Sequence, residues 1–391
     1  MKYTLATLLP ICLGLMLTAS STANVIGGRR LFKFQSKSDF SAFLLSGARW
    51  DAAGSGIVFD SHGAKSDEGG LPYGMIESPD IEIGFPCDQI VVSWNSITPP
   101  GSYLTVYIQA RSAGFWSRRF TVAIWNRDDR PVDRMSVNGQ KDEIAEMDTD
   151  ILRLKKPADA FRVSAKLSSL DGRTYPTLRL LAAQAVNSKD INVGMRPRRS
   201  VWGQDLPVPE RSQLTVPDGI RFCSATSTAM VLDYWAQKLG RPDLSVPLQE
   251  AVDRIYDKEY GGTGNWPFNA AFAAEFGGLR AYVTRFAGIP MIEEWIAKGV
   301  PVIVSMDCNI LTHNEAKGKM GHLMVFRGFT ETGDCIINDP YTKLDKGESV
   351  RKIFSRADFE PSWLSDKAAM GTVYLIYPDG WGIPRNSHLA W

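Results

Sequence analysis

The apolar residues change their period along the chain, and this change limits the fold more than any other feature. Between residues 81 and 186 they alternate with polar residues, so that Phe120, Val122 and Ile124 share one face of the run RRFTVAIW. The runs SYLTVYIQA, AFRVSAKL and TLRLLA repeat the pattern, and TPPGS, NRDDRP and LDGRTYP separate them as turns. Many short strands with one solvated face predict an antiparallel β-sandwich or jelly roll.

The second half follows a helical period first and a strand-like pattern later. Ala225, Ala229 and Leu232 recur at helical spacing in CSATSTAMVLDYWAQKLGRP, and Gly240 and Pro242 end that helix. We expect further helices across WPFNAAFAAEFG and MIEEWIAKG, and strands at VPVIVSM, HLMVFRGF, DCIIND and TVYLIYP. Helices followed by a sheet predict an α+β domain.

A stretch without periodicity, NSKDINVGMRPRRSVWGQDLPVPERS, separates the two halves. It gathers Pro, Gly and Arg, which is typical of a linker. A chain of 391 residues exceeds what one typical core holds, which favours two domains. We therefore predict a β-sandwich over residues 24–190, a linker over 191–206 and the α+β domain over 207–391.

The first 23 residues have the features of a secretory signal. Lys2 gives a positive start, Leu5 to Leu17 is apolar, and small residues end at Ala23. The apolar stretch is short for a membrane span and no second one follows, so we expect a signal peptide over 1–23 and no integral membrane domain after its cleavage. A membrane-anchored N-terminus is the alternative. We expect the mature protein to be secreted, periplasmic or on the cell surface.

Composition excludes several classes of function. Basic side chains number 44 and acidic ones 43, and this net charge of +1 predicts no nucleic-acid partner. Cys87, Cys223, Cys308 and Cys335 would remain after signal cleavage, which is too few for a disulfide scaffold of this size; whether Cys308 and Cys335 pair stays open. HExxH and CxxC patterns are absent, so we expect neither a metal site nor a cofactor.

Cys223 begins the predicted helix, where it is either an inert buried thiol or a nucleophile. A nucleophilic Cys needs a base, an orienting acid and an oxyanion donor, and a helix N-terminus favours its thiolate. His322 opens the run GHLMVFRGF and Asp339 closes CIINDPY, with TETGD midway between them. If TETGD is a hairpin turn, His322 and Asp339 become cross-strand neighbours, and a carboxylate so placed orients an imidazole.

Plainer interpretations exist for these residues. His322 is also compatible with a satisfied core histidine, and Asp339 with turn chemistry before Pro340. His313 is a rival base, although the polar stretch LTHNEAKGK predicts a loop around it. Gln213 is equally compatible with a solvated position near the linker.

Several stretches of the second half resemble the papain-like cysteine peptidases, and within them the family typified by bacteriocin-processing, double-glycine-leader peptidases and their secreted relatives. They are Gln213, ten positions before the thiol, then CSATSTAMVL, GNWPFNAAFAAEFGG, GVPVIVS, GHLMVFRGF and INDPY. They follow the family's order from Val208 to the C-terminus. Many relatives have Pro two residues after the Cys, where this chain has Ala225. The β-rich first half lies outside the resemblance.

The resemblance implies an activity and a role for each residue. Cys223 would be the nucleophile of a papain-like cysteine peptidase, and His322 its base and then its acid. Asp339 would orient the imidazole, and Gln213 would share the oxyanion hole with the backbone N–H of Cys223. The substrate would be a peptide or protein, cell-wall peptides included.

The cleft and the first half leave further alternatives. Trp266 and Asn269 of the stretch GGTGNWPFN are candidate substrate-binding residues near the thiol, although Trp266 also suits a core position. The same site would suit an acyltransferase or amidase that acts on cell-wall peptides. A non-catalytic surface or carbohydrate-binding protein is the other alternative, in which Trp94, Trp116 and Trp125 stack on sugar; their place on alternating strands equally suits a core.

Overall fold

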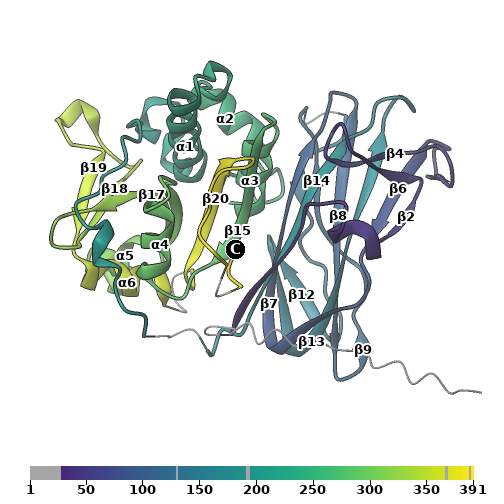
Figure 1. Ribbon diagram of the computed structural model, residues 1–391, viewed down its shortest axis with the longest axis horizontal. Helices are drawn as coiled ribbons and strands as arrows, with labels where there is room; N and C mark the ends of the chain where they lie inside the picture. The colour runs from purple at the N-terminus through teal and green to yellow at the C-terminus, as the bar shows by residue number, and fades with distance from the viewer. Residues whose placement is uncertain (1–27, 129–130, 191–193, 366–368, 387–388) are drawn as a thin grey trace, which may run out of the picture.

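The computed structural model describes residues 28–128, 131–190, 194–365, 369–386 and 389–391, so the predicted signal peptide over 1–23 lies outside the described residues. The sheet of the first half stands beside the helices and the second sheet of the other half (Figure 1). Both large sheets are built from antiparallel strand pairs. In the described part of the chain, no helix has the length and apolar character of a membrane span.

The first half is built almost entirely of strands. They are β1 (Arg29–Phe34), β2 (Leu44–Ser46), β3 (Ala48–Asp51), β4 (Gly56–Phe59), β5 (Lys65–Ser66), β6 (Pro72–Glu77), β7 (Ile81–Ile97), β8 (Ser102–Ser112), β9 (Phe115–Trp116), β10 (Phe120–Trp125), β11 (Met135–Ser136), β12 (Ala145–Asp148), β13 (Ile151–Ser169) and β14 (Thr177–Val186). The main path of the sheet runs β11-β10-β8-β13-β7-β14-β4-β3.

The two-sheet sandwich stays a prediction, whereas the antiparallel strands are confirmed. β13 has 19 residues and pairs along its length with β6, β7, β8 and β12. Because such long strands change partners, hydrogen bonds join all of these strands into one network of 14. The division of the chain at residues 190 and 207 also stays a prediction.

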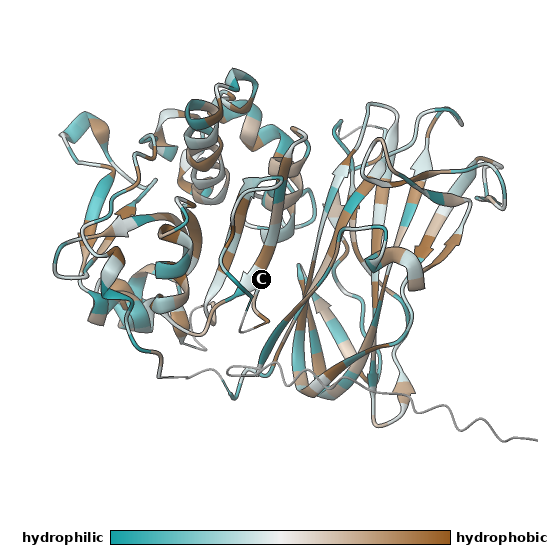
Figure 2. Cartoon of the chain, in the orientation of Figure 1, coloured by the Kyte–Doolittle hydropathy of each residue, from teal (hydrophilic) through white to brown (hydrophobic). Residues whose placement is uncertain are grey.

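The predicted face of β10 is right for Phe120 and Val122 but wrong for Ile124. The register of β10 against β8 shifts between Thr121 and Ala123, so a β-bulge turns the following side chains over. Trp125 is therefore buried and Ile124 only partly buried, the reverse of the simple alternation. Figure 2 shows hydrophobic and hydrophilic bands alternating along many of the other strands of this half.

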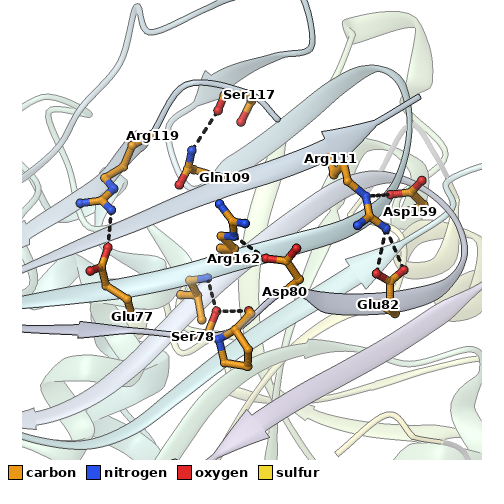
Figure 3. Close-up of polar contacts among 12 residues, drawn as sticks. Glu77, Ser78, Asp80, Glu82, Gln109, Arg111, Ser117, Arg119, Asp159 and Arg162 are labelled. Carbon is orange, nitrogen blue, oxygen red and sulfur yellow. Dashed lines mark hydrogen bonds and ion pairs between the residues drawn. The ribbon is translucent and has the colours of Figure 1, made fainter. Parts of the chain in front are cut away.

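The solvated face of this sheet carries paired charges. Arg119 pairs with Glu77, and Arg162 pairs with Asp80 (Figure 3). Arg111 contacts both Glu82 and Asp159 at 2.8 Å. Opposite charges across neighbouring strands make small favourable contributions and keep this face polar.

The described residues of the second half form six α-helices, several short 3-10 helices and a six-stranded sheet. The helices are α1 (Cys223–Leu239), α2 (Leu248–Ile255), α3 (Trp266–Ala274), α4 (Ile289–Ile296), α5 (Cys308–Leu311) and α6 (Arg356–Leu364). The strands are β15 (Leu279–Arg285), β16 (Val302–Asp307), β17 (Gly321–Phe329), β18 (Cys335–Asn338), β19 (Arg351–Phe354) and β20 (Thr372–Pro378), in the order β15-β20-β16-β17-β18-β19. The sheet is antiparallel, as the α+β prediction requires.

Local signals set the ends of the helices near the site. Gly240 ends α1 in the left-handed conformation at φ 63°, and its N–H donates to the carbonyl of Ala236. Asn265 caps α3 by accepting from the N–H of Phe268, with Pro267 in the first turn. α1 packs against β17, and α3 packs against β15 and also against β7 of the first half.

β15 is an outer strand of its sheet, and side chains of β7 cover the edge of β15 that faces away from β20. Asn95 donates to the carbonyl of Ala281 at 2.5 Å and accepts from the N–H of the same residue at 3.1 Å. Ser93 accepts from the N–H of Val283 at 3.2 Å. An uncovered edge leaves backbone groups unpaired, so the first half satisfies groups that a further strand would otherwise satisfy.

An aromatic cluster fills the contact between the halves. Phe268 of α3 packs edge-on against Trp94 and Trp125, with ring centroids 6.0 and 5.3 Å away. Both tryptophans are buried, so they belong to the core and not to a sugar-binding surface. Trp116 is only partly buried, and the guanidinium of Arg162 lies 4.0 Å from its ring centroid.

Candidate active site

Cys223 is the first residue of α1 and lines a cavity of about 700 Å³. The 17-residue helix points its positive end at the thiol, which favours the thiolate. One turn later Ser227 donates to the carbonyl of Leu323 at 3.1 Å, which fixes α1 against the start of β17. That start is where His322 lies.

His322 and Asp339 form a buried hydrogen-bonded pair. His322 lies in β17 and Asp339 directly follows β18, and the two strands are joined by a hairpin in which Thr330 donates from its N–H to the carbonyl of Asp334. The Nε2 atom of His322 lies 2.8 Å from Oδ1 of Asp339. His322 is 6% exposed, as is Asp339, so little water competes for this contact.

Two further contacts hold the Asp339 carboxylate. The N–H of Tyr341 donates to Oδ1 at 2.9 Å, and the Lys352 ammonium of β19 donates to Oδ2 at 2.6 Å. Burial raises the pKa of Asp339, but the contacts with His322 and Lys352 outweigh it and lower the pKa below its usual value. Sequence reasoning missed Lys352, because the segment GESVRKIF carries no recognisable motif.

The Cys223 thiol interacts with the His322 ring, whose Nδ1 is the nitrogen left to face it once Asp339 takes Nε2. Burial raises the pKa of Cys223, yet the hydrogen bond and charge of His322 and the N–H groups of Leu323 and Ser224 lower it overall. Burial lowers the pKa of His322, while Asp339 and then Cys223 raise it to about 9. Both shifts favour a thiolate beside an imidazolium over the same two groups when each is isolated.

Gln213 lies in η3 (Gln213–Thr215), packed against the short helix η4 (Gly219–Arg221) that leads to Cys223. Its Nε2 donates to the carbonyl of Gly219 at 2.8 Å, and its backbone N–H donates to the carbonyl of Pro340 at 2.9 Å. Its buried Oε1 has no partner. A Cβ on Gly219 would lie 1.9 Å from the Gln213 carbonyl oxygen, so this approach requires glycine. One N–H of the amide stays available.

Only one of the two predicted substrate-binding residues faces the cavity. Trp266 lines it together with Cys223 and Tyr260. Asn269 is fully buried: it donates to the carbonyls of Thr263 and Asn265 at 2.8 Å, and it accepts from Thr228. Asn269 stabilises the turn before α3 from inside, so its predicted place in the cleft is wrong.

The first half supplies part of the cavity wall, which sequence reasoning missed. Asp148, Asp150 and Arg153 line it. Asp150 accepts from the N–H of Trp266 at 2.8 Å, and burial raises its pKa to about 7. The segment EMDTD can be read from the sequence, but Asp150 is 116 residues from Trp266, so no local pattern indicates their contact.

The remaining histidines and cysteines do not join this arrangement. His313 is exposed and lies 3.2 Å from Asp358, while His388 is outside the described residues. All four described cysteines are free, which excludes a Cys308–Cys335 disulfide in this structure. Burial raises the pKa of Cys308 to about 12, in contrast to Cys223. Among the described residues, no three His, Cys, Asp or Glu side chains gather as metal ligands.

The sequence matches two family models. Residues 30–186 match the Peptidase C39 N-terminal domain, and residues 205–370 match the Peptidase C39 like family. A search of curated proteins found no match. Among solved structures, a C39-like protein from Bacillus anthracis is 19% identical, with 44% of this chain and 96% of that chain covered and a TM-score of 0.32.

A second solved structure comes from work on endo-acting O-glycanases with which members of the human gut microbiota initiate mucin breakdown. It is 12% identical, covers 40% of this chain and 100% of that chain, and has a TM-score of 0.22. Likenesses this distant support no inference about fold or function. The family assignment therefore rests on the two family models.

Proposed function

Because the chain belongs to the C39-like peptidase family, we propose that it is an exported cysteine peptidase with a papain-like catalytic half. The observation that carries the proposal is that one imidazole links a carboxylate to a thiol. Asp339 is hydrogen-bonded to Nε2 of His322, and the same ring interacts with the Cys223 thiol at a helix N-terminus. This is the arrangement that activates a thiol for acyl transfer.

In the proposed reaction, the Cys223 thiolate attacks the carbonyl carbon of the scissile amide. The negative charge moves to the carbonyl oxygen, where the free N–H of the Gln213 amide and the backbone N–H of Cys223 stabilise it. His322 gives its proton to the departing amine, which leaves a thioester on Cys223. His322 then takes a proton from water, and the resulting hydroxide releases the acid and restores the thiolate.

A peptide library tests this function by comparing wild type with Cys223→Ala. We expect cleavage by wild type and none by the variant, while Cys308→Ala, which changes a thiol outside the proposed reaction, keeps its activity. Equal cleavage by wild type and Cys223→Ala would exclude the proposed nucleophile. Product analysis with an added amine separates the two chemistries of one thioester, because a hydrolase gives mainly the free acid and an acyltransferase gives the new amide.

Export is proposed from the signal-like residues 1–23 alone. Fractionation of the producing cells checks it, together with the N-terminal sequence of the released protein. We expect a mature chain that starts after Ala23. Recovery of the full-length chain in the cytoplasm alone would contradict export without affecting the proposed chemistry.

A further inference from the structure

The cavity beside Cys223 is built by both halves of the chain. The first half contributes Gln89 of β7 and the segment around Asp148 to Arg153, and the second half contributes residues on both sides of the thiol. The cavity measures about 700 Å³, enough for several side chains of a bound peptide. Trp266 and Tyr260 give it an aromatic wall.

Charged residues in the lining are mostly basic. The cationic ones are Arg153, Arg221, Arg285 and Lys319, and the acidic ones are Asp148 and Asp150. Arg153 is already paired with Asp148 at 2.7 Å. Asp150 is engaged by the N–H of Trp266. The net charge that faces a ligand is therefore positive. Two of the cationic side chains, Arg221 and Lys319, are exposed.

Arg285 is the unusual member of this set, because among the described residues its buried guanidinium has no carboxylate at ion-pair distance, and only the more distant charges of Asp150 and Asp88 act on it. It is 1% exposed, and its polar partners are neutral: Gln89 at 3.0 Å and Thr372 at 3.2 Å. Its Nη2 atom has no hydrogen-bond partner, and among the described residues no carboxylate lies within 4.0 Å of the guanidinium. The guanidinium also lies 6.0 Å from the Trp266 ring centroid.

Burying a cation without an opposite charge is costly, and proteins normally pair it. Burial lowers the pKa of Arg285 to about 10, so it stays charged at neutral pH. Asp150 and Asp88 offset only part of this cost, and because Arg285 lies in the lining of the Cys223 cavity, a bound ligand can supply a closer negative charge.

We propose that this cavity selects acidic peptides, with a substrate carboxylate compensating Arg285 while the peptide bond lies at Cys223. The inference deepens the proposed function and rests on it for the position of the scissile bond. It assigns to the first half a direct part in substrate choice, since Gln89 of β7 holds the guanidinium in place.

The test uses the full-length protein and fluorogenic peptides in which one position at a time is Glu or Gln. We expect one position at which Glu raises kcat/KM by about 10- to 100-fold, the range of a hydrogen bond to a charged group. Arg285→Met should abolish that preference. Arg221→Gln and Lys319→Gln, which change exposed side chains and are not expected to impair folding, should each reduce it by about two- to threefold in a salt-dependent way. Lys346→Gln, an exposed cation outside the cavity, is the matched control.

Binding of the same peptide pairs to Cys223→Ala, followed by fluorescence anisotropy, separates this inference from the proposed function. Tighter binding of Glu peptides without any cleavage by wild type would support the acidic specificity and refute the peptidase. Cleavage with equal or better use of Gln at every position would refute the acidic specificity and leave the peptidase standing. If Arg285→Met fails to fold, equal binding of the Glu and Gln peptides by Cys223→Ala at every position would overturn the inference.

Discussion

Replacing Asp339 by Asn tests the electrostatic account of the site most directly. The pKa of His322 is about 9, against an ordinary value of 6.5. The difference of about 2.5 units corresponds to about 3 kcal/mol in favour of the imidazolium, at 1.36 kcal/mol per unit. Because burial alone lowers this pKa, Asp339 and Cys223 together contribute more than that difference. Asn keeps the shape but removes the charge, and Lys352 stays beside the side chain at position 339. We expect the pKa of His322 to fall by about 1–3 units.

The assay is the pH dependence of Cys223 alkylation by iodoacetamide, read by peptide mapping, with an NMR titration of His322. In wild type we expect alkylation well below pH 9, since the pKa of Cys223 is lowered. In Asp339→Asn the thiolate form should need a higher pH, while Cys308, with a pKa of about 12, stays slow in both proteins. Asp345→Asn, at an exposed site, is the control for the same chemical change. An unchanged His322 titration in Asp339→Asn would refute the reasoning.

Three further predictions follow from single contacts. Burial raises the pKa of Asp150 from 3.8 to about 7, so its ionisation destabilises the fold increasingly above pH 4. In urea unfolding, Asp150→Asn should exceed wild type in stability by up to about 4 kcal/mol at pH 8 and should equal it near pH 4. Equal stability of the two proteins at both pH values would contradict this. Gly219→Ala should lose about 1–3 kcal/mol by overpacking against Gln213, whereas Gly321→Ala, with open space at its Cβ, should be nearly neutral in the same unfolding experiment. Lys352→Met should lower kcat about tenfold at unchanged KM, because the Asp339 carboxylate that orients His322 loses its contact with the lysine. An unchanged kcat would show that Lys352 only stabilises the strand.

The parts of this structure that the sequence predicts are those set by local patterns. The helix that starts at Cys223 follows from apolar spacing and from Gly240, and it forms where expected. The strands around His322 and Asp339 follow from two apolar runs on either side of TETGD, and the hairpin brings the two side chains within 2.8 Å. Their catalytic roles remain a proposal, because a hydrogen bond shows position and not turnover.

The parts that the sequence does not predict depend on contacts between distant residues or on local irregularity. The bulge between Thr121 and Ala123 reverses the face of the end of β10 without any turn residue to signal it. β14 is buried on both faces because the second half covers one of them, whereas alternation suggests one wet face. Asp150 and Trp266 are 116 residues apart, and Arg285 and Gln89 are 196 apart. Nothing in either segment alone indicates its partner.

The contact between the halves makes the first half part of the proposed enzyme and not an accessory. Asn95 satisfies both backbone groups of Ala281, on the strand whose last residue is Arg285. Asp150 holds the N–H of Trp266 at the start of α3, whose Phe268 packs into the tryptophan cluster. Polar contacts that are satisfied and fully buried fix one arrangement more strictly than apolar packing alone. The cavity wall, its aromatic residues and the buried guanidinium are therefore held by the same contacts with the first half. A substitution in β7 should alter substrate binding before it alters the reactivity of the Cys223 thiol.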